Sequence, residues 1–207
     1  MPQSRQLAAI MFTDIVGYTA LMGSDEEKAF SILNKNRALQ KPIIEQFNGR
    51  WIKELGDGVM VSFNSVSDSV NAAIKIQEES HAIPDLQITI GLHLGEVVFE
   101  NDDVFGDGVN IASRIQALSI PGSIYISEAI HNNISNKQGI ETRFVKQEKL
   151  KNVVSPASIY EVVIASNALS SKPSNKVMEE ESSGKSIAVL PFVNMSNDPD
   201  QDYFCDG

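Results

Sequence analysis

The sequence has one cysteine, three histidines and no long apolar run. Cys205 has no second cysteine to pair with, so an internal disulfide is excluded and nothing calls for an oxidising compartment. No His or Cys pair stands at the spacing of a zinc site. The apolar run near the N-terminus is broken by Asp14, which leaves it too short for a membrane span and unlike a signal peptide. We therefore expect a cytoplasmic domain whose segment here has no membrane contact.

Positive charge is also scarce. The chain has 17 Lys and Arg against 27 Asp and Glu, which gives a net charge of −10. This balance disfavours nucleic acid and anionic membranes as partners, because both require a basic surface. An anionic nucleotide remains possible, since a few local cations and bound metal ions can hold it. With 207 residues, 42% of them hydrophobic, the chain can form one domain with some residues left over.

The most informative stretch is Trp51–Phe63, in which two apolar-alternating runs flank Gly56-Asp57-Gly58. This pattern predicts a β-hairpin whose turn uses the permissive backbone of both glycines. The turn carries the carboxylate of Asp57. Such a carboxylate either bonds to its own backbone as a turn former or provides half of a metal site.

A second carboxylate follows the apolar run Leu7–Phe12, which is typical of a strand buried on both faces. Asp14 ends this run and a helical pattern begins after Gly17. Asp14 is therefore either a helix N-cap or a residue placed where backbone N–H groups start to face an anion.

The middle of the chain alternates helices and strands. We predict a helix over 24–47, capped by Ser24 with Glu27 completing a capping box, and a second helix over 65–81. Residues 87–99 alternate as a long strand or bent hairpin, in which Gly91 and Gly95 mark bulges or close approaches. His93 lies within this strand, and we interpret it as a structural histidine with its hydrogen bonds satisfied.

An acidic turn at 100–103 leads through residues 104–108 into a third helix. This helix begins near Val109 and places Asn110 and Arg114 on one face. That face is either a solvated surface or part of a site. Strands are expected at 124–126, 142–145 and 157–164, with a short helix from Ser127 and a basic loop at 149–153. The order predicts an α+β fold: a ferredoxin-like βαββαβ core with additional C-terminal strands and a helix, one sheet with helices packed on one face.

The C-terminal part has a different composition. We expect a first domain over residues 1–165, a flexible linker over the Ser-, Lys- and Glu-rich residues 166–185, and a truncated second domain over 186–207. The last segment contains the strand-like run Ile187–Phe192. It resembles the opening of a TolB-like segment.

Three blocks of the first domain resemble one family, in the right order: 12–19 (FTDIVGYT), 53–58 (KELGDG) and 103–114 (DVFGDGVNIASR). They are similar to the signature blocks of the class III nucleotidyl cyclase catalytic domain, and the resemblance covers about residues 5–164. Three ordered blocks are far more specific than one short motif.

The resemblance implies a metal site and a phosphate site. Asp14 and Asp57 match the aspartates that hold two divalent cations, Mg²⁺ or Mn²⁺, with the backbone carbonyl of Ile15. One ion activates the ribose 3′-oxygen and the other binds the triphosphate. The amides that open the following helix would bind phosphate oxygens as substrate-binding groups: Gly17, Tyr18 and Thr19.

The resemblance also implies a base site and a transition-state site. Lys53 and Asp103 match the pair that reads the purine, and guanylate cyclases carry Glu and a small residue there, so the pair favours ATP. Asn110 and Arg114 match the catalytic pair. Lys151 matches a lysine on the triphosphate, with Lys149 as its rival. Glu96 departs from the family pattern, since some mammalian cyclases have a phosphate-clamping Arg there.

In this family the metal residues come from one chain and the purine and catalytic residues from its partner. The resemblance therefore implies a head-to-tail homodimer with two active sites, acting as an adenylate cyclase that converts ATP to 3′,5′-cyclic AMP and pyrophosphate. Two alternatives stay open: a catalytically silent nucleotide-sensing dimerisation module that regulates a downstream domain, and a guanylate cyclase.

Overall fold

A computed structural model describes residues 5–151 and 156–164. The chain divides into two units, and all the described residues belong to the first, Met1–Lys172. The predicted linker over 166–185 and the predicted TolB-like segment over 186–207 lie outside the described residues. Within the described ranges, no helix is long and apolar enough to cross a membrane.

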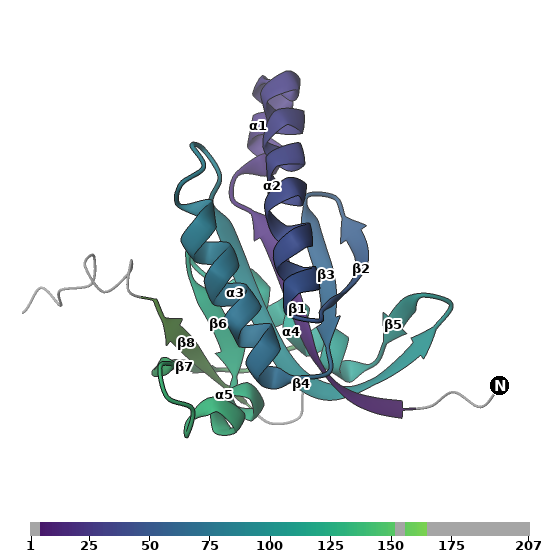
Figure 1. The fold of residues 1–207 in the computed structure, drawn as a ribbon, viewed down its shortest axis with the longest axis vertical. Helices are drawn as coiled ribbons and strands as arrows, with labels where there is room; N and C mark the ends of the chain where they lie inside the picture. The colour runs from purple at the N-terminus through teal and green to yellow at the C-terminus, as the bar shows by residue number, and fades with distance from the viewer. Residues whose placement is uncertain (1–4, 152–155, 165–207) are drawn as a thin grey trace, which may run out of the picture. The chain divides into compact units, whose positions relative to one another are not determined.

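Eight strands form one sheet in the order β2-β3-β1-β4-β6-β8-β7, and β5 pairs with β4 outside this path. The elements in chain order are β1 (Arg5–Ile15), α1 (Tyr18–Ser24), α2 (Glu26–Gln46), β2 (Arg50–Leu55), β3 (Gly58–Phe63), α3 (Val66–Ser80), β4 (Ile88–Glu100), β5 (Asp103–Phe105), α4 (Asp107–Leu118), β6 (Ile124–Ser127), α5 (Glu128–Ile134), β7 (Glu141–Glu148) and β8 (Ala157–Val163). Figure 1 shows α2 and α3 side by side across one face of this sheet.

The predicted α+β class is confirmed. The strands β1, β2, β3 and β4 with the long helices α2 and α3 follow the order βαββαβ, and β1 lies between β3 and β4, antiparallel to both. The added C-terminal strands and helix are also present as β6, α5, β7 and β8. The buried strand predicted over Leu7–Phe12 is part of β1, which is buried over Ala8–Thr13.

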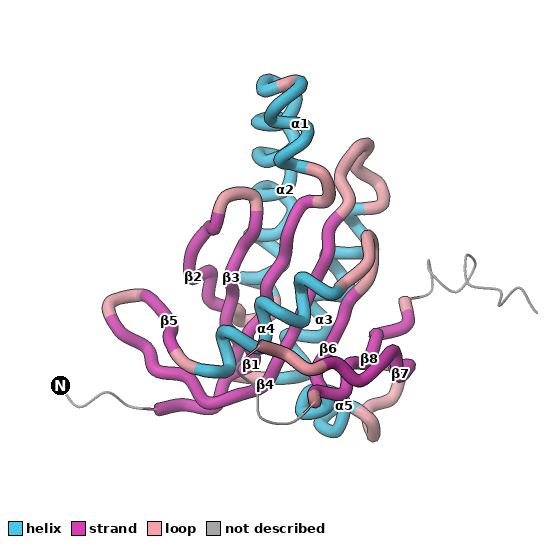
Figure 2. Tube along the Cα trace, turned by 180° about the vertical axis from the view of Figure 1, so that it is seen from behind, coloured by secondary structure: helices cyan, strands magenta, loops and turns pink. Residues whose placement is uncertain are grey.

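The two faces of the sheet have different cores. Because strand residues alternate between faces, Ala9 and Met11 pack with α2, α3 and α5, whereas Ile10 and Phe12 lie on the opposite face. Helix α4 covers that opposite face, where Figure 2 shows it in front of the sheet. The sheet thus has the two long helices on one face and α4 alone on the other.

Helix α4 approaches β4 closely at the two glycines that the sequence marked. A Cβ on Gly91 would lie 2.2 Å from the backbone nitrogen of Gln116, and a Cβ on Gly95 would lie 3.1 Å from Cα of Gly108. Of the two predicted roles, close approach is therefore confirmed. These contacts set the position of α4 on the sheet.

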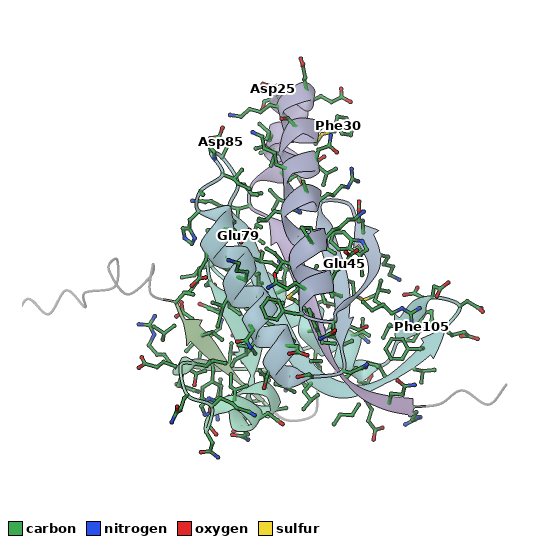
Figure 3. The ribbon with its side chains drawn as sticks, in the orientation of Figure 1. Asp25, Phe30, Glu45, Glu79, Asp85 and Phe105 are labelled. Atoms are coloured by element: carbon green, nitrogen blue, oxygen red, sulfur yellow. The ribbon has the colours of Figure 1, made fainter. Side chains whose placement is uncertain are left out.

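Three local predictions were wrong. The N-cap of α2 is Asp25, which Figure 3 labels at the tip of the helix. Its carboxylate accepts from the Lys28 N–H at 3.0 Å, while Ser24 ends α1 and its hydroxyl donates back to Ala20 O. Gly58 has no positive φ; a Cβ there would lie 2.9 Å from Thr13 O, so close packing requires this glycine. Gly56 does adopt a positive φ, of 70°. Residues 103–105 form strand β5 where the sequence suggested only a turn.

Candidate functional site

Asp14 and Asp57 meet at one end of the sheet. Asp14 is the penultimate residue of β1, and Asp57 lies in the turn between β2 and β3, the strand that pairs with β1 through Thr13 and Val59. Gly58 lies against them, since a Cβ there would be 3.1 Å from Asp14 Oδ1. Burial and the neighbouring Asp57 carboxylate raise the pKa of Asp14 to about 6. The two carboxylates that the resemblance assigns to one metal site are therefore neighbours in the fold.

This pair is a chemically suitable place for a divalent cation. Two carboxylates in close proximity repel each other, and an ion with a preference for hard oxygen ligands would neutralise both. Among the described residues there is no group of three or more His, Cys, Asp and Glu that could hold a metal. A metal at this pair would therefore need further oxygen atoms, from a backbone carbonyl such as that of Ile15 or from a bound ligand.

The turn after β1 opens helix α1. Gly17 is its N-cap with φ of 75°, in the left-handed region, and among the described residues no side-chain hydrogen bond caps this helix. Gly17 and Thr19 are exposed and Tyr18 is half-buried. Val16 and Gly17 also line a cavity of about 650 Å³ together with the loop that precedes β4.

Lys53 and Asp103 form an ion pair. Lys53 Nζ lies 2.6 Å from Asp103 Oδ2, and Asp103 Oδ1 accepts from the Val104 N–H at 2.8 Å. The hydrogen bond from Lys53 and that from Val104 lower the pKa of Asp103 below its ordinary value. Lys53 and Asp103, which the resemblance assigns together to purine recognition, are therefore in direct contact although they come from different strands.

A bulge in β2 aims Lys53 at Asp103. Trp51 pairs with Val61, whereas Lys53 pairs with Met60, so one extra residue, Ile52, is inserted. In a regular ladder Lys53 would oppose Val59, on the face covered by α2. The inserted residue moves Lys53 to the face of Met60, on which α4 and β5 lie.

Asn110 and Arg114 lie four residues apart on α4, on the face that the helical period predicts. Asn110 is exposed and Arg114 is half-buried. Neither side chain has a hydrogen bond or ion pair with any described residue. The Gln116 amide donates to Thr89 Oγ1 at 2.8 Å and thereby ties the same helix to β4 beside Asp14.

The loop that follows β7 carries both candidate lysines, and Lys149 and Lys151 are exposed. Leu150 between them is buried against Ile115 of α4, which brings the loop next to the helix that carries Arg114. Residues 152–155 lie outside the described ranges, so the two lysines are equivalent candidates on this geometry.

The site residues thus form separate groups on one face of the sheet. The even-numbered residues of β1, which include Asp14, point to the face of the sheet that α4 covers. Lys53 and Asp103 lie on the same face. In the described part of the chain, no hydrogen bond or ion pair joins the aspartate pair to Lys53, Asp103, Asn110 or Arg114.

Two findings at this face were not foreseen. The Nδ1 atom of His93 is buried without a hydrogen-bond partner in the described residues, so the interpretation of a satisfied histidine was wrong; burial lowers the pKa of His93 to about 4.

Arg50 also pairs with Asp102 at 2.6 Å beside Lys53 and Asp103. The signal for that pair was Asn101-Asp102 between two alternating segments, which is a hairpin turn. Glu96 forms an exposed ion pair with Arg5 at 3.7 Å.

Residues 1–162 match the family model described as the adenylate and guanylate cyclase catalytic domain. The chain belongs to this family. A relative named "Putative adenylate cyclase 3" from Rhizobium meliloti (strain 1021) is 36% identical over 98% of this chain, which spans 36% of that relative's length.

Solved structures of cyclase domains share the fold. The adenylate/guanylate cyclase/hydrolase from Silicibacter pomeroyi superposes with a TM-score of 0.73 at 30% identity, covering 77% of this chain and 98% of the other. The adenylyl cyclase CyaB from P. aeruginosa gives a TM-score of 0.72 at 25% identity, covering 79% and 96%. The cyclase family is therefore supported by both sequence and structure.

Proposed function

We propose that this cyclase domain is an adenylate cyclase that converts ATP to 3′,5′-cyclic AMP and pyrophosphate. The observation that supports this choice is the ion pair between Lys53 and Asp103. A relative over nearly the full chain also carries an adenylate cyclase name.

The base preference follows from hydrogen-bond complementarity. The ammonium of Lys53 would donate to a ring nitrogen of adenine, and the carboxylate of Asp103 would accept from its exocyclic amine. Guanine has a carbonyl at the position of that amine, so Asp103 would face an acceptor. A buried acceptor facing an acceptor costs far more than a merely lost contact, which gives discrimination against GTP.

Asp14 and Asp57 would hold the metal, with the carbonyl of Ile15 as a further ligand. Cyclase domains of this family generally use divalent metals. Bound Mg²⁺ or Mn²⁺ would supply charge neutralisation and activation of the ribose 3′-oxygen for in-line attack on the α-phosphorus. The uncapped amides of Gly17, Tyr18 and Thr19 would donate to phosphate oxygens beside that ion.

Helix α4 would act on the transition state. Asn110 would orient the ribose, and the guanidinium of Arg114 would neutralise charge that develops on the α-phosphoryl oxygens. Both side chains lack partners among the described residues, so they are available to a ligand. Lys151, from the loop packed against α4, would bind the triphosphate.

We further propose that two chains share each active site, head to tail. Among the described residues of one chain, Asp14 and Asp57 have no polar contact with the proposed adenine-binding residues or with the two α4 residues. One protomer would therefore supply the two aspartates, and its partner would supply the adenine-binding and α4 residues. Exposed apolar side chains flank both groups, since Leu55 is 49% and Phe105 is 51% exposed. Phe105 projects from β5 at the edge of the fold (Figure 3). A partner chain would cover these side chains.

Incubation with ATP or GTP and Mn²⁺, followed by separation of the products, tests the function. We expect cyclic AMP from ATP and little cyclic GTP. Cyclic GTP as the main product would replace the proposal with a guanylate cyclase, and binding without any cyclic product would indicate a silent nucleotide-sensing module.

A further inference from the structure

Two neighbouring ion pairs join β2 to the β4–β5 turn. Arg50 Nη2 lies 2.6 Å from Asp102 Oδ1, and Lys53 Nζ lies 2.6 Å from Asp103 Oδ2. In the described part of the chain, β5 has backbone pairing only with β4. The two ion pairs are therefore the polar links that hold the β4–β5 turn beside β2. Figure 1 shows this turn as an arm that extends from the sheet.

The bulge at Ile52 is what allows both pairs to form. Residues three apart on a regular strand point to opposite faces, so Arg50 and Lys53 would normally diverge. Arg50 pairs with Ser62 and Lys53 with Met60, two residues on the same face of β3. The bulge thus places two cations opposite two consecutive carboxylates.

The β4–β5 turn has a charged residue at a position where glycine would fit the backbone conformation better. Glu100 pairs with Asp103, so Asn101 and Asp102 form a two-residue connection, with φ of 47° and 66°. A hairpin turn with two positive φ angles prefers glycine at the second position. Asp102 adopts this conformation at an energetic cost that glycine would avoid, and it provides the carboxylate for Arg50.

Arg50 has a second contact besides Asp102. Its guanidinium carbon lies 5.6 Å from the centre of the Phe99 ring, on β4. Such a cation–π contact fixes the side chain over the strand that leads into the turn. Arg50 therefore holds both the strand and the tip of the β4–β5 arm.

We propose that Arg50 and Asp102 are positioning residues for base recognition. This inference depends on the proposed function, in which Lys53 and Asp103 bind adenine. When these two turn from each other to the base, their mutual ion pair weakens. The Arg50–Asp102 pair has no role toward the base and keeps the two elements at a constant separation. Adenine then meets a donor and an acceptor already at the right spacing.

The solvent exposure of Arg50 and Asp102 limits how much the loss of their ion pair should change KM for ATP. The side chains of Arg50 and Asp102 are 49% and 95% exposed, and exposed pairs contribute little to folding. We therefore expect about a threefold increase in KM for ATP when the pair is lost, with kcat almost unchanged. The ratio of kcat/KM for ATP to that for GTP should fall by a similar factor.

The test is a double-mutant cycle with Arg50→Gln, Asp102→Asn and the double variant. Asn tolerates positive φ, so Asp102→Asn removes the charge and keeps the turn. Each single change should raise KM and reduce the ATP/GTP ratio, and the double variant should be no worse than either. Lys75→Gln removes an exposed ion pair on α3, between Lys75 and Glu79, and is the control that leaves both quantities unchanged.

Asp102→Gly separates positioning from stability. It relieves the turn, so the melting temperature should stay equal or rise, while KM for ATP increases. An unchanged KM and ATP/GTP ratio in the single variants of an active enzyme would overturn the inference, as would fully additive effects in the double variant. A wild-type protein that makes no cyclic AMP would instead contradict the proposed function.

Discussion

The carboxyl groups of Asp14 and Asp57 are neighbours where β1 ends and the β2–β3 hairpin turns, and burial, together with the Asp57 carboxylate, raises the pKa of Asp14 to about 6. The folded chain therefore holds a proton on Asp14 more tightly than the unfolded chain does. Stability from this group is present in acid and is lost as the pH rises through about 6. Near neutral pH the pair destabilises the fold unless a cation neutralises it.

Asp57→Asn should therefore stabilise the metal-free protein at pH 8 and abolish turnover. Removal of one charge relieves the repulsion, and we expect the melting temperature to rise by on the order of 2 °C. In the wild type, Mn²⁺ should raise the melting temperature at pH 8, and the variant should lose most of this response. The measurement is thermal unfolding with and without Mn²⁺. Equal Mn²⁺ responses in both proteins would count against a metal at this pair.

A mixture of inactive variants should regain activity. Asp57→Ala would damage the proposed metal site, and Asn110→Ala would damage the proposed catalytic pair. In a head-to-tail dimer of one chain of each kind, one active site contains both defects and the other contains none. Random pairing in an equal mixture makes half of the dimers mixed, so activity should reach roughly a quarter of wild type. Activity that stays at the level of the separate variants would contradict shared sites.

Local patterns predicted much of the fold. The alternation and the Gly56-Asp57-Gly58 turn predicted β2 and β3, and the buried run predicted β1, because hydrophobic period and turn chemistry act within a few residues. The close approaches at Gly91 and Gly95 were also expected. Boundaries were less certain: Ser24 and Asp25 are both good caps, and the sequence pattern alone did not show that Ser24 ends α1 while Asp25 caps α2.

Other features depend on partners that are distant in sequence. The bulge at Ile52 is defined by its register with β3, and the contact of Lys53 with Asp103 spans 50 residues. The resemblance to cyclases placed these two residues in one role, but spacing alone could not. The unpartnered Nδ1 of His93 likewise follows from how α4 covers β4, which no local pattern contains.

The base preference should change when the reading pair changes. Lys53→Glu combined with Asp103→Ser offers guanine an acceptor for its ring N–H and amine and a small hydroxyl near its carbonyl. We expect kcat/KM for ATP to fall by about 100-fold and that for GTP to rise. The measurement is product analysis with each nucleotide. Lys53→Glu alone is the matched control: it places two carboxylates together and should impair both substrates. Retained ATP preference in the double variant would contradict the assignment of this pair.

His93 should make the fold sensitive to acid. Its pKa is lowered to about 4, so the unfolded chain takes up the proton first as the pH falls below the ordinary value of 6.5. Stability is thus complete above about pH 6.5 and is lost toward pH 4, by about 2 kcal/mol at pH 5. His93→Leu removes this group, so its melting temperature should fall less between pH 7 and pH 5. Parallel pH profiles for the two proteins would contradict this account.

The position of α4 should depend on Gly91. A Cβ there would lie 2.2 Å from the Gln116 nitrogen and 2.5 Å from its Cα, and backbone atoms cannot move aside as a flexible side chain can. Gly91→Ala should therefore push α4 away from β4, destabilise the fold by about 1–3 kcal/mol, and displace Asn110 and Arg114 together. Because both of the proposed catalytic groups would move, activity should fall more than the loss of folded protein explains. Gly23→Ala in α1 is the control, since nothing lies within 4 Å of its Cβ and alanine favours a helix. It should leave activity intact and stabilise the fold slightly. A Gly91→Ala protein with wild-type turnover per folded molecule would contradict the inference that the packing of α4 on β4 positions Asn110 and Arg114 for catalysis.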